Sequence, residues 1–440
     1  MGSLSVGGRA LCALAFFAVC ICAARGSAEF DVRAFGAKGD GETKDTAAVQ
    51  RALDACAQAG GGRVTVPPGT YLVGSVYLGN RTELHLKEGA TLLGSPDLAD
   101  YNAPDAYPQN WCSAKEGWSA KHLVLALEKH GVSITGRGVI DGNARAFFDD
   151  KPQLVGKVCW RDGGVNARVA GGRPGQEIVF IECRDVAVRD VTLRDMSCWS
   201  CFFHGCENVT VGGVTVRNDI TYLNTDGIDV DSCRNVEIGD CDIVTGDDAI
   251  TVRGASARLK NPAMACENVR VSNIVCRVSA DGMRVGVGSG TIRNVRVSDM
   301  KVERGGRDIH VQCFFGNSHP KGVDISDVSF ERISIRDVVE AVNVGVGAPG
   351  AARLENIRFR EVAAEGGSPS LVCGTRAVRV KGVTFTDCSF NVAGPAAAKG
   401  EVFRIERADA VSFHNCKFNG VQGADARRLF SVRDAATINF

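Results

Sequence analysis

The residues with the clearest potential for chemistry are three aspartates, Asp226, Asp247 and Asp248, in the stretch 224–253. Alternating apolar residues follow each group of acids, Ile228 and Val230 in one case and Ile250 and Val252 in the other. A period of two is typical of a strand with one buried face. The acids therefore precede two short strands, and stacking of these strands would bring the three carboxyl groups into one cleft.

Neighbouring carboxyl groups can share the work of cleaving a glycosidic bond. Their mutual repulsion raises the pKa of one group and leaves another ionised. The protonated group then donates to the leaving oxygen, while the carboxylate activates a water molecule. Acids on adjacent coils, displaced sideways, would match the separation of about 6.5–9.5 Å typical of inverting glycosidases. The alternative uses of such aspartates are to satisfy turn amides or to bind calcium.

An internal repeat supplies the elements that would position these acids. A valine or isoleucine begins each short Val-x-Val-like segment, at residues Val132, Val186, Val209, Val236, Val269, Val295, Val328, Ile357, Val383 and Val411. Each repeat has room for two or three short strands and no helix, so its apolar face is buried only by stacking on copies of itself. Propeller repeats of roughly 40 residues are longer. The sequence therefore predicts an all-β parallel β-helix.

A short helix is expected to cover the N-terminal end of this solenoid, because terminal units of repeat folds need caps. In the stretch 46–56, Val49, Leu53 and Cys56 fall on one helical face. The glycines at 60–62 would end the helix.

The first residues have the pattern of a secretory signal. Arg9 precedes an apolar stretch at 11–24, and small residues follow at 26–28. This apolar stretch is too short for a typical membrane span. We expect residues 1–28 to be removed and residues 29–440 to form one catalytic domain that is secreted or periplasmic, monomeric and free of the membrane.

The amino-acid composition limits the kinds of binding partner that can be expected. Lys+Arg and Asp+Glu each number 51, so the formal net charge is zero, which gives no indication of nucleic acid or an anionic membrane as a partner. The chain has 18 cysteines, of which Cys12, Cys20 and Cys22 lie in the signal. A fold of this size does not need a disulfide framework, so we expect mostly small buried thiols. The sequence also leaves room for one or two disulfides, whose cysteines it does not identify.

Alignment of the alternating segments predicts columns of polar residues along the solenoid. The first column holds Asp226, Asp248, Asp281, Arg307 and Glu340. The next outward positions hold Asp229, Thr251, Arg284, His310 and Asn343, and the third column holds Asp231, Arg253, Gly286, Gln312 and Gly345. The sequence thus predicts a strip of carboxylates flanked by Arg253, Arg284, Arg307 and His310. Like charges at strand spacing repel, so such a strip indicates function.

The chain resembles glycoside hydrolase family 28, the polygalacturonase group, over about residues 30–420. The resemblance is carried by the segments Arg173-Pro174, Ile181-Glu-Cys183, Cys206-Glu-Asn-Val209, Asn224-Thr-Asp226-Gly and Gly246-Asp247-Asp248. It implies a single-stranded right-handed parallel β-helix and inverting hydrolysis of α-linked galacturonans. It also implies that Asp247 is the general acid, and that Asp226 and Asp248 position and deprotonate the water.

Two motifs depart from the family pattern. The third motif, GHG, reads Ala280-Asp281-Gly282 here, and the fourth, RIK, reads His310-Val-Gln312. In the family the arginine and lysine of RIK typically bind a uronate carboxylate, so ordinary polygalacturonate is a less obvious substrate. Arg284 or Arg307 could supply the cation from a neighbouring position, since guanidinium binds carboxylate in a bidentate way.

The resulting prediction is a glycoside hydrolase acting on a pectin-like or related cell-wall polysaccharide or oligosaccharide, with no metal or other cofactor. The predicted substrate-binding residues are Asn224, Arg253, Asp281, Arg284, Arg307 and His310. One alternative is a β-helical lyase, with calcium on the acids and an arginine base; Arg284 beside Asp281 keeps it open. Another is a non-catalytic carbohydrate-binding solenoid, favoured by the altered motifs and opposed by the intact aspartate motifs.

Overall fold

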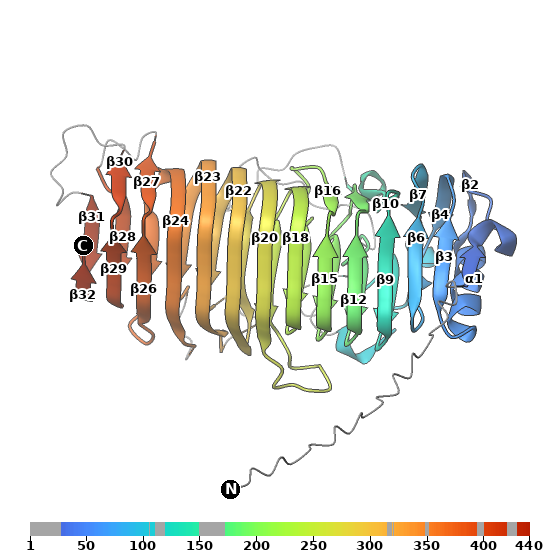
Figure 1. The fold of residues 1–440 in the computed structure, drawn as a ribbon, viewed down its shortest axis with the longest axis horizontal. Helices are drawn as coiled ribbons and strands as arrows, with labels where there is room; N and C mark the ends of the chain where they lie inside the picture. The colour runs from blue at the N-terminus through green and yellow to red at the C-terminus, as the bar shows by residue number, and fades with distance from the viewer. Residues whose placement is uncertain are drawn as a thin grey trace, which may run out of the picture.

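The computed structural model describes residues 28–104, 106–110, 119–148, 172–314, 319, 321–347, 352–393, 400–419 and 429–440. Figure 1 shows these residues as strands stacked side by side along one long axis, from the N-terminal end to the C-terminal end. All of the strand pairings are parallel, and they join 32 strands of the described residues into one sheet. This arrangement confirms the predicted parallel β-helix. The signal expected at residues 1–28 lies outside the described residues except for Ala28.

The first part of the solenoid contains β1 (Glu29–Asp31), β2 (Asp40–Lys44), β3 (Gly62–Val66), β4 (Gly69–Val73), β5 (Val76–Tyr77), β6 (Thr82–Leu86), β7 (Ala90–Gly94), β8 (Val124–Leu127), β9 (His130–Gly136), β10 (Val139–Asp141), β11 (Ile178–Ile181), β12 (Arg184–Arg189), β13 (Thr192–Arg194), β14 (Cys201–His204), β15 (Glu207–Gly212) and β16 (Thr215–Arg217). The second part contains β17 (Ile228–Asp231), β18 (Arg234–Thr245), β19 (Ile250–Gly254), β20 (Cys266–Val278), β21 (Asp281–Gly288), β22 (Thr291–Gln312), β23 (Asp324–Gly345), β24 (Leu354–Ser368), β25 (Ser370–Cys373), β26 (Val380–Thr386), β27 (Ser389–Val392), β28 (Phe403–Glu406), β29 (Ala408–His414), β30 (Lys417–Asn419), β31 (Phe430–Arg433) and β32 (Ala436–Asn439). The helices are η1 (Val32–Phe35), α1 (Thr46–Gln58), η2 (Leu98–Asp100), η3 (Pro108–Asn110) and η4 (Ala144–Ala146).

The repeated valine positions set the register of the whole solenoid. Val186 pairs with Val132 on one side and with Val209 on the other. The same pairing continues from coil to coil through Val236, Val269, Val295, Val328, Ile357, Val383 and Val411. These side chains are 0–2% exposed, so each coil buries its apolar face against the next, as the repeat predicts.

The helix α1 lies at the N-terminal end of the stack (Figure 1). Its buried side chains include Val49, Leu53 and Cys56, and it contacts β1, β3, β5 and β6. The capping helix is therefore confirmed. At the other end, stacked phenylalanines fill the core, with ring centroids 5.1 Å apart for Phe330–Phe359 and 4.6 Å apart for Phe359–Phe385.

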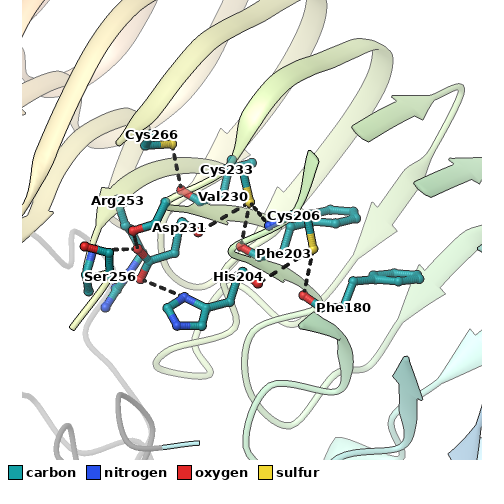
Figure 2. Close-up of polar contacts among 12 residues, drawn as sticks. Phe180, Phe203, His204, Cys206, Val230, Asp231, Cys233, Arg253, Ser256 and Cys266 are labelled. Carbon is teal, nitrogen blue, oxygen red and sulfur yellow. Dashed lines mark hydrogen bonds and ion pairs between the residues drawn. The ribbon is translucent and has the colours of Figure 1, made fainter. Parts of the chain in front are cut away.

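The thirteen cysteines of the described residues are all free thiols. Most are buried, and several donate to carbonyl oxygens of the preceding coil: the Cys206 Sγ lies 3.1 Å from the oxygen of Phe180, and the Cys233 Sγ lies 3.4 Å from that of Phe203 (Figure 2). The expectation of small buried thiols is confirmed for this part of the chain. Among the described residues, no helix combines the length and the apolarity that crossing a membrane requires.

Candidate active site

One column of strands carries the acids: β14, β17, β19, β21, and the C-terminal parts of β22 and β23. Asp281 pairs with Arg307, and Arg307 pairs with Glu340. The N–H groups of Gly227 and Ala249 donate to the carbonyl oxygens of Asp248 and Asp281, each at 2.9 Å. Asp226, Asp248, Asp281, Arg307 and Glu340 therefore follow one another from coil to coil, as the alignment predicts.

The second column is also as predicted, since Asp229, Thr251, Arg284, His310 and Asn343 form successive pairs. The third column is wrong at one point. Asp231 pairs with Arg253, but the register shifts between Val252 and Gly254, so Arg253 and Gly286 do not pair as predicted. The strand β21 carries one extra residue there, and Val287 has a φ of 69°, which is the geometry of a β-bulge.

The three aspartates meet in space. One carboxylate oxygen from each of Asp226, Asp247 and Asp248 lies within 4.8 Å of the others. The residues are 6%, 6% and 2% exposed, so water screens them poorly. This closest approach is shorter than the 6.5–9.5 Å carboxyl separation expected of inverting enzymes, so the stereochemistry stays a prediction. Oxygens this close could share protons or hold a cation.

The protonation states follow from burial and charge. Burial raises the pKa of Asp226 well above its usual range, and the charges of Asp247, Asp229 and Asp248 raise it further. Burial and the Asp248 charge likewise raise the pKa of Asp247. Burial and the Asp281 charge also raise the pKa of Asp248. Arg284 opposes this rise, because its Nη1 lies 3.2 Å from the Asp248 Oδ2. Asp248 is thus the member of the three with a cation directly against it.

Asn224 holds Asp247 from two sides. Its backbone N–H and its side-chain Nδ2 both donate to the Asp247 Oδ2, each at 3.1 Å. A left-handed backbone, with φ 60°, allows both donors to face the same oxygen. The Asn224 Oδ1 accepts from the Arg173 Nη2 at 3.2 Å. The structure therefore places Asn224 as a partner of the acid, while contact with substrate stays a prediction.

The altered third and fourth motifs meet each other. The His310 Nδ1 lies 2.6 Å from the Asp281 Oδ2, and because a carboxylate only accepts, the imidazole N–H donates. Burial lowers the pKa of His310 to about 4, so the ring is neutral at pH 7. Burial opposes ionisation of Asp281, but His310, Arg307 and Arg284 outweigh it and lower its pKa. Asp281 is therefore a buried carboxylate.

The predicted substrate-binding residues differ in how far their side chains are exposed. Asp281 and His310 are 0% exposed, so the expectation that they face outward is wrong, while their contact with substrate stays a prediction. The side chains of Arg284 and Arg307 are 9% and 21% exposed. Arg253 is also buried, and it packs over the Trp199 ring at 4.5 Å.

Arg253 belongs to a second buried cluster next to the acids. Its Nε lies 3.4 Å from the Asp231 Oδ2, and the His204 Nδ1 lies 3.7 Å from the same oxygen (Figure 2). Asp231 also accepts from the Ala255 N–H at 2.6 Å. These contacts hold Arg253 toward the protein interior, so its predicted role in binding substrate also becomes less direct.

A family comparison gives these residues a context. The family model described as "Glycosyl hydrolases family 28" matches residues 56–400. The chain belongs to this family. A curated relative, the exo-poly-alpha-D-galacturonosidase of Dickeya chrysanthemi, is 30% identical over 271 residues, which cover 53% of this chain and 44% of the relative. The probable polygalacturonase of Vitis vinifera is 28% identical over 307 residues, covering 67% and 58%. The matches thus span about half the length of these two relatives.

Solved structures of family 28 share the fold. The exopolygalacturonase of Thermotoga maritima has a TM-score of 0.70 at 24% identity, covering 89% of this chain and 92% of that one. The family 28 exopolygalacturonase of Yersinia enterocolitica also has a TM-score of 0.70, at 19% identity, covering 93% and 78%. At these identities the likeness supports the β-helix and not the substrate.

Three residues of this family 28 site were not among the site residues predicted from the sequence. Asp229 is fully buried, and burial raises its pKa well above the usual range, against the Arg253 charge. Burial raises the pKa of Glu340 to about 7, at the end of the acid column. Arg173 contacts Asn224 across 51 residues. The columns contained Asp229 and Glu340, but nothing in the repeat indicates the contact of Arg173, which lies outside it.

Proposed function

We propose that this family 28 protein is an exported glycoside hydrolase that cleaves a galacturonan-like polysaccharide or oligosaccharide with inversion and without a metal ion. The observation that carries the proposal is the meeting of Asp226, Asp247 and Asp248, whose oxygens lie within 4.8 Å of one another in a buried site. Carboxyl groups at this distance release their protons one after another, so protonated and ionised forms coexist. Acid–base hydrolysis needs this coexistence.

The surroundings support a division of roles. Asp247 acts as the general acid, because burial and Asp248 favour its protonated form. The two N–H groups of Asn224 then stabilise the carboxylate that remains after the proton has left. Asp248, with Arg284 at 3.2 Å, serves with Asp226 to position the water and accept its proton.

Arg307 is the best candidate for recognition of a uronate carboxylate. Its side chain is 21% exposed, whereas those of Arg284 and Arg253 are 9% and 5% exposed. Guanidinium is suited to bidentate binding of a carboxylate. The names of the two curated relatives, a galacturonosidase and a polygalacturonase, support a uronate-rich substrate.

The lyase alternative is weakened by the state of Arg284. A lyase base must be deprotonated, but Arg284 lies 3.2 Å from Asp248 and 3.9 Å from Asp281. Although burial favours its neutral form, these acids outweigh burial and raise the pKa of Arg284 above its ordinary value. The guanidinium therefore holds its proton.

The test is a product analysis of the purified protein on polygalacturonate and on rhamnogalacturonan, with and without EDTA. We expect products whose masses sum to that of the substrate plus one water per bond cleaved, a first-formed anomer of inverted configuration by NMR, and no effect of EDTA. The Asp247→Asn variant should lose about 10²–10⁴-fold in kcat, the usual contribution of a general acid. Unsaturated products, or unchanged turnover in this variant, would refute the proposal.

A further inference from the structure

Arg173 lies behind the proposed general acid and takes no part in the roles assigned so far. Its Nη2 donates to the Asn224 Oδ1 at 3.2 Å. Its Nη1 donates to the carbonyl oxygens of Ser197 and Leu223, at 2.5 and 2.7 Å. The residue is 9% exposed, and its guanidinium joins the backbone at Ser197 and Leu223 to the Asn224 amide that contacts Asp247.

The guanidinium is fixed in direction as well as in place. It lies over the Phe148 ring, 5.0 Å from the centroid, and Phe148 stacks on Tyr222 at 4.1 Å. The nearby Glu177 is buried, and burial raises its pKa to about 7 even though the Arg173 charge opposes this. A planar fork with an aromatic face against it has little freedom to turn.

This contact determines which way round the Asn224 amide lies. A guanidinium only donates, so the atom facing Arg173 must be the amide oxygen. The amide nitrogen then faces the Asp247 Oδ2, where the Asn224 backbone N–H also points. Two donors on the Oδ2 leave no room for a proton on that oxygen. The proton of the neutral acid therefore resides on the Oδ1.

We propose that Arg173 is a positioning residue for the general acid: by fixing the Asn224 amide, it confines the transferable proton of Asp247 to the Oδ1. The inference rests on the proposed function. In the step that it serves, the Oδ1–H bond breaks and the proton goes to the glycosidic oxygen. The C1–O bond breaks with its electron pair on that oxygen, water forms the new bond to C1, and the proton of the water passes to the Asp226–Asp248 pair. Asp247 is left as a carboxylate whose Oδ2 accepts two N–H bonds.

The pH dependence has a definite sign. The charged groups that act on Asp247 are Asp248, Asp226, Asp229, Asp281 and Arg284. The acids raise the pKa of Asp247, while Arg284 and the backbone N–H of Asn224 lower it. The Asn224 side-chain amide donates to the same oxygen and favours the ionised form in the same way. Loosening Asn224 should therefore raise the pKa of the acid and move the basic limb of the kcat/KM profile to higher pH, even as kcat falls.

The test compares a poor leaving group with a good one. Trigalacturonate needs protonation of its leaving oxygen, whereas a 2,4-dinitrophenyl digalacturonide does not. We expect Arg173→Lys to lower kcat on trigalacturonate about 10–100-fold, part of the range for a general acid, and on the dinitrophenyl substrate less than about 3-fold. Asn224→Gly is the second variant, because glycine accepts the φ of 60° and keeps the backbone N–H while it removes the amide. It should show the same selectivity.

The matched control is Arg217→Lys. Arg217 Nη1 also donates to two carbonyl oxygens, those of Val216 and Asp242 at 2.8 and 2.9 Å, and its Nη2 binds the half-exposed Asp242 carboxylate, which is not one of the three clustered aspartates. The change should therefore affect both substrates equally and little. Suppose that Asp247→Asn loses more activity on trigalacturonate than on the dinitrophenyl substrate. Equal losses on both substrates in Arg173→Lys and Asn224→Gly, with no shift of the basic limb, would then overturn the inference and leave the proposed function standing. If Asp247→Asn lacks selectivity too, the proposed function fails, and the inference fails with it.

Discussion

Replacement of Arg284 by methionine is the perturbation whose consequence the structure defines best. The Arg284 Nη1 lies 3.2 Å from the Asp248 Oδ2 and 3.9 Å from the Asp281 Oδ2. At an effective dielectric constant of about 20, two unit charges at 3.2 Å attract by about 5 kcal/mol. Removing one partner of a buried ion pair generally costs about 3–5 kcal/mol, because the remaining charge is left buried and unpaired. We expect a loss of that size at pH 7.

The loss should depend on pH in one direction. Asp281 has a lowered pKa, so its contribution to stability is present above the unfolded value near 3.9 and disappears as the pH falls through the folded value. Without Arg284 this contribution shrinks, and the already raised pKa of Asp248 rises further, which penalises the folded state as the pH increases. The difference between the wild type and the variant should therefore be larger at pH 8 than at pH 4.

The assay is equilibrium urea unfolding at pH 4, 7 and 8, and the matched control is Arg332→Met. Arg332 binds Asp299 at 2.7 and 2.8 Å, but both side chains are almost half exposed, so its loss should cost less than about 1 kcal/mol at any of these pH values. A cost for Arg284→Met no larger than that of the control, or one that does not change with pH, would refute the assignment of Asp248 and Asp281 as buried charges that need this cation.

Three further predictions concern binding, packing and metals. Arg307→Gln should raise KM on oligogalacturonates about 10-fold or more with a small change in kcat, if its partly exposed guanidinium binds a uronate carboxylate; an unchanged KM would remove it from the binding site. Phe359→Ala should lower the free energy of unfolding by about 3–5 kcal/mol, because the ring is 1% exposed between Phe330 and Phe385; a loss below about 1 kcal/mol in urea melts would contradict this packing. Dialysis against EDTA should leave both the melting temperature and kcat unchanged, and a loss restored by calcium would show that the acids hold a cation.

The register of the solenoid could be predicted because alternation and stacking both follow from the sequence. A one-residue slip would turn every apolar side chain of a strand to the wrong face, so the pairing of Val186 with Val132 and Val209 is strongly specified. The column from Asp226 to Glu340 is fixed by the same rule. The register shift after Val252 was not predictable, because it falls at the C-terminal ends of β19 and β21, beyond the paired apolar residues that set the alignment.

Burial and long-range contacts were beyond the repeat pattern. Position in a column tells which residues are neighbours, but not how deeply neighbouring segments cover them, so His310 and Asp281 were expected to face outward and are instead enclosed. Arg173 lies outside the repeats and reaches the backbone of Ser197 and Leu223 and the Asn224 amide through its own side chain. The resemblance to the family included Arg173-Pro174, but the contact of Arg173 with Asn224 is known only from the structure.

The two departures from the family motifs are one change rather than two. Asp281 and His310 occupy adjacent coils and contact each other at 2.6 Å. Asp281 alone would add an unpaired buried charge to an already acidic column, and such a charge is costly. His310, Arg307 and Arg284 together lower its pKa and so stabilise it as a carboxylate. Arg284 also pairs with Asp248, and of Arg253, Arg284 and Arg307 the last has the most exposed side chain, at 21%. If Arg307 binds an anionic sugar as proposed, recognition stays on the coil of the fourth motif, because β22 carries both Arg307 and His310.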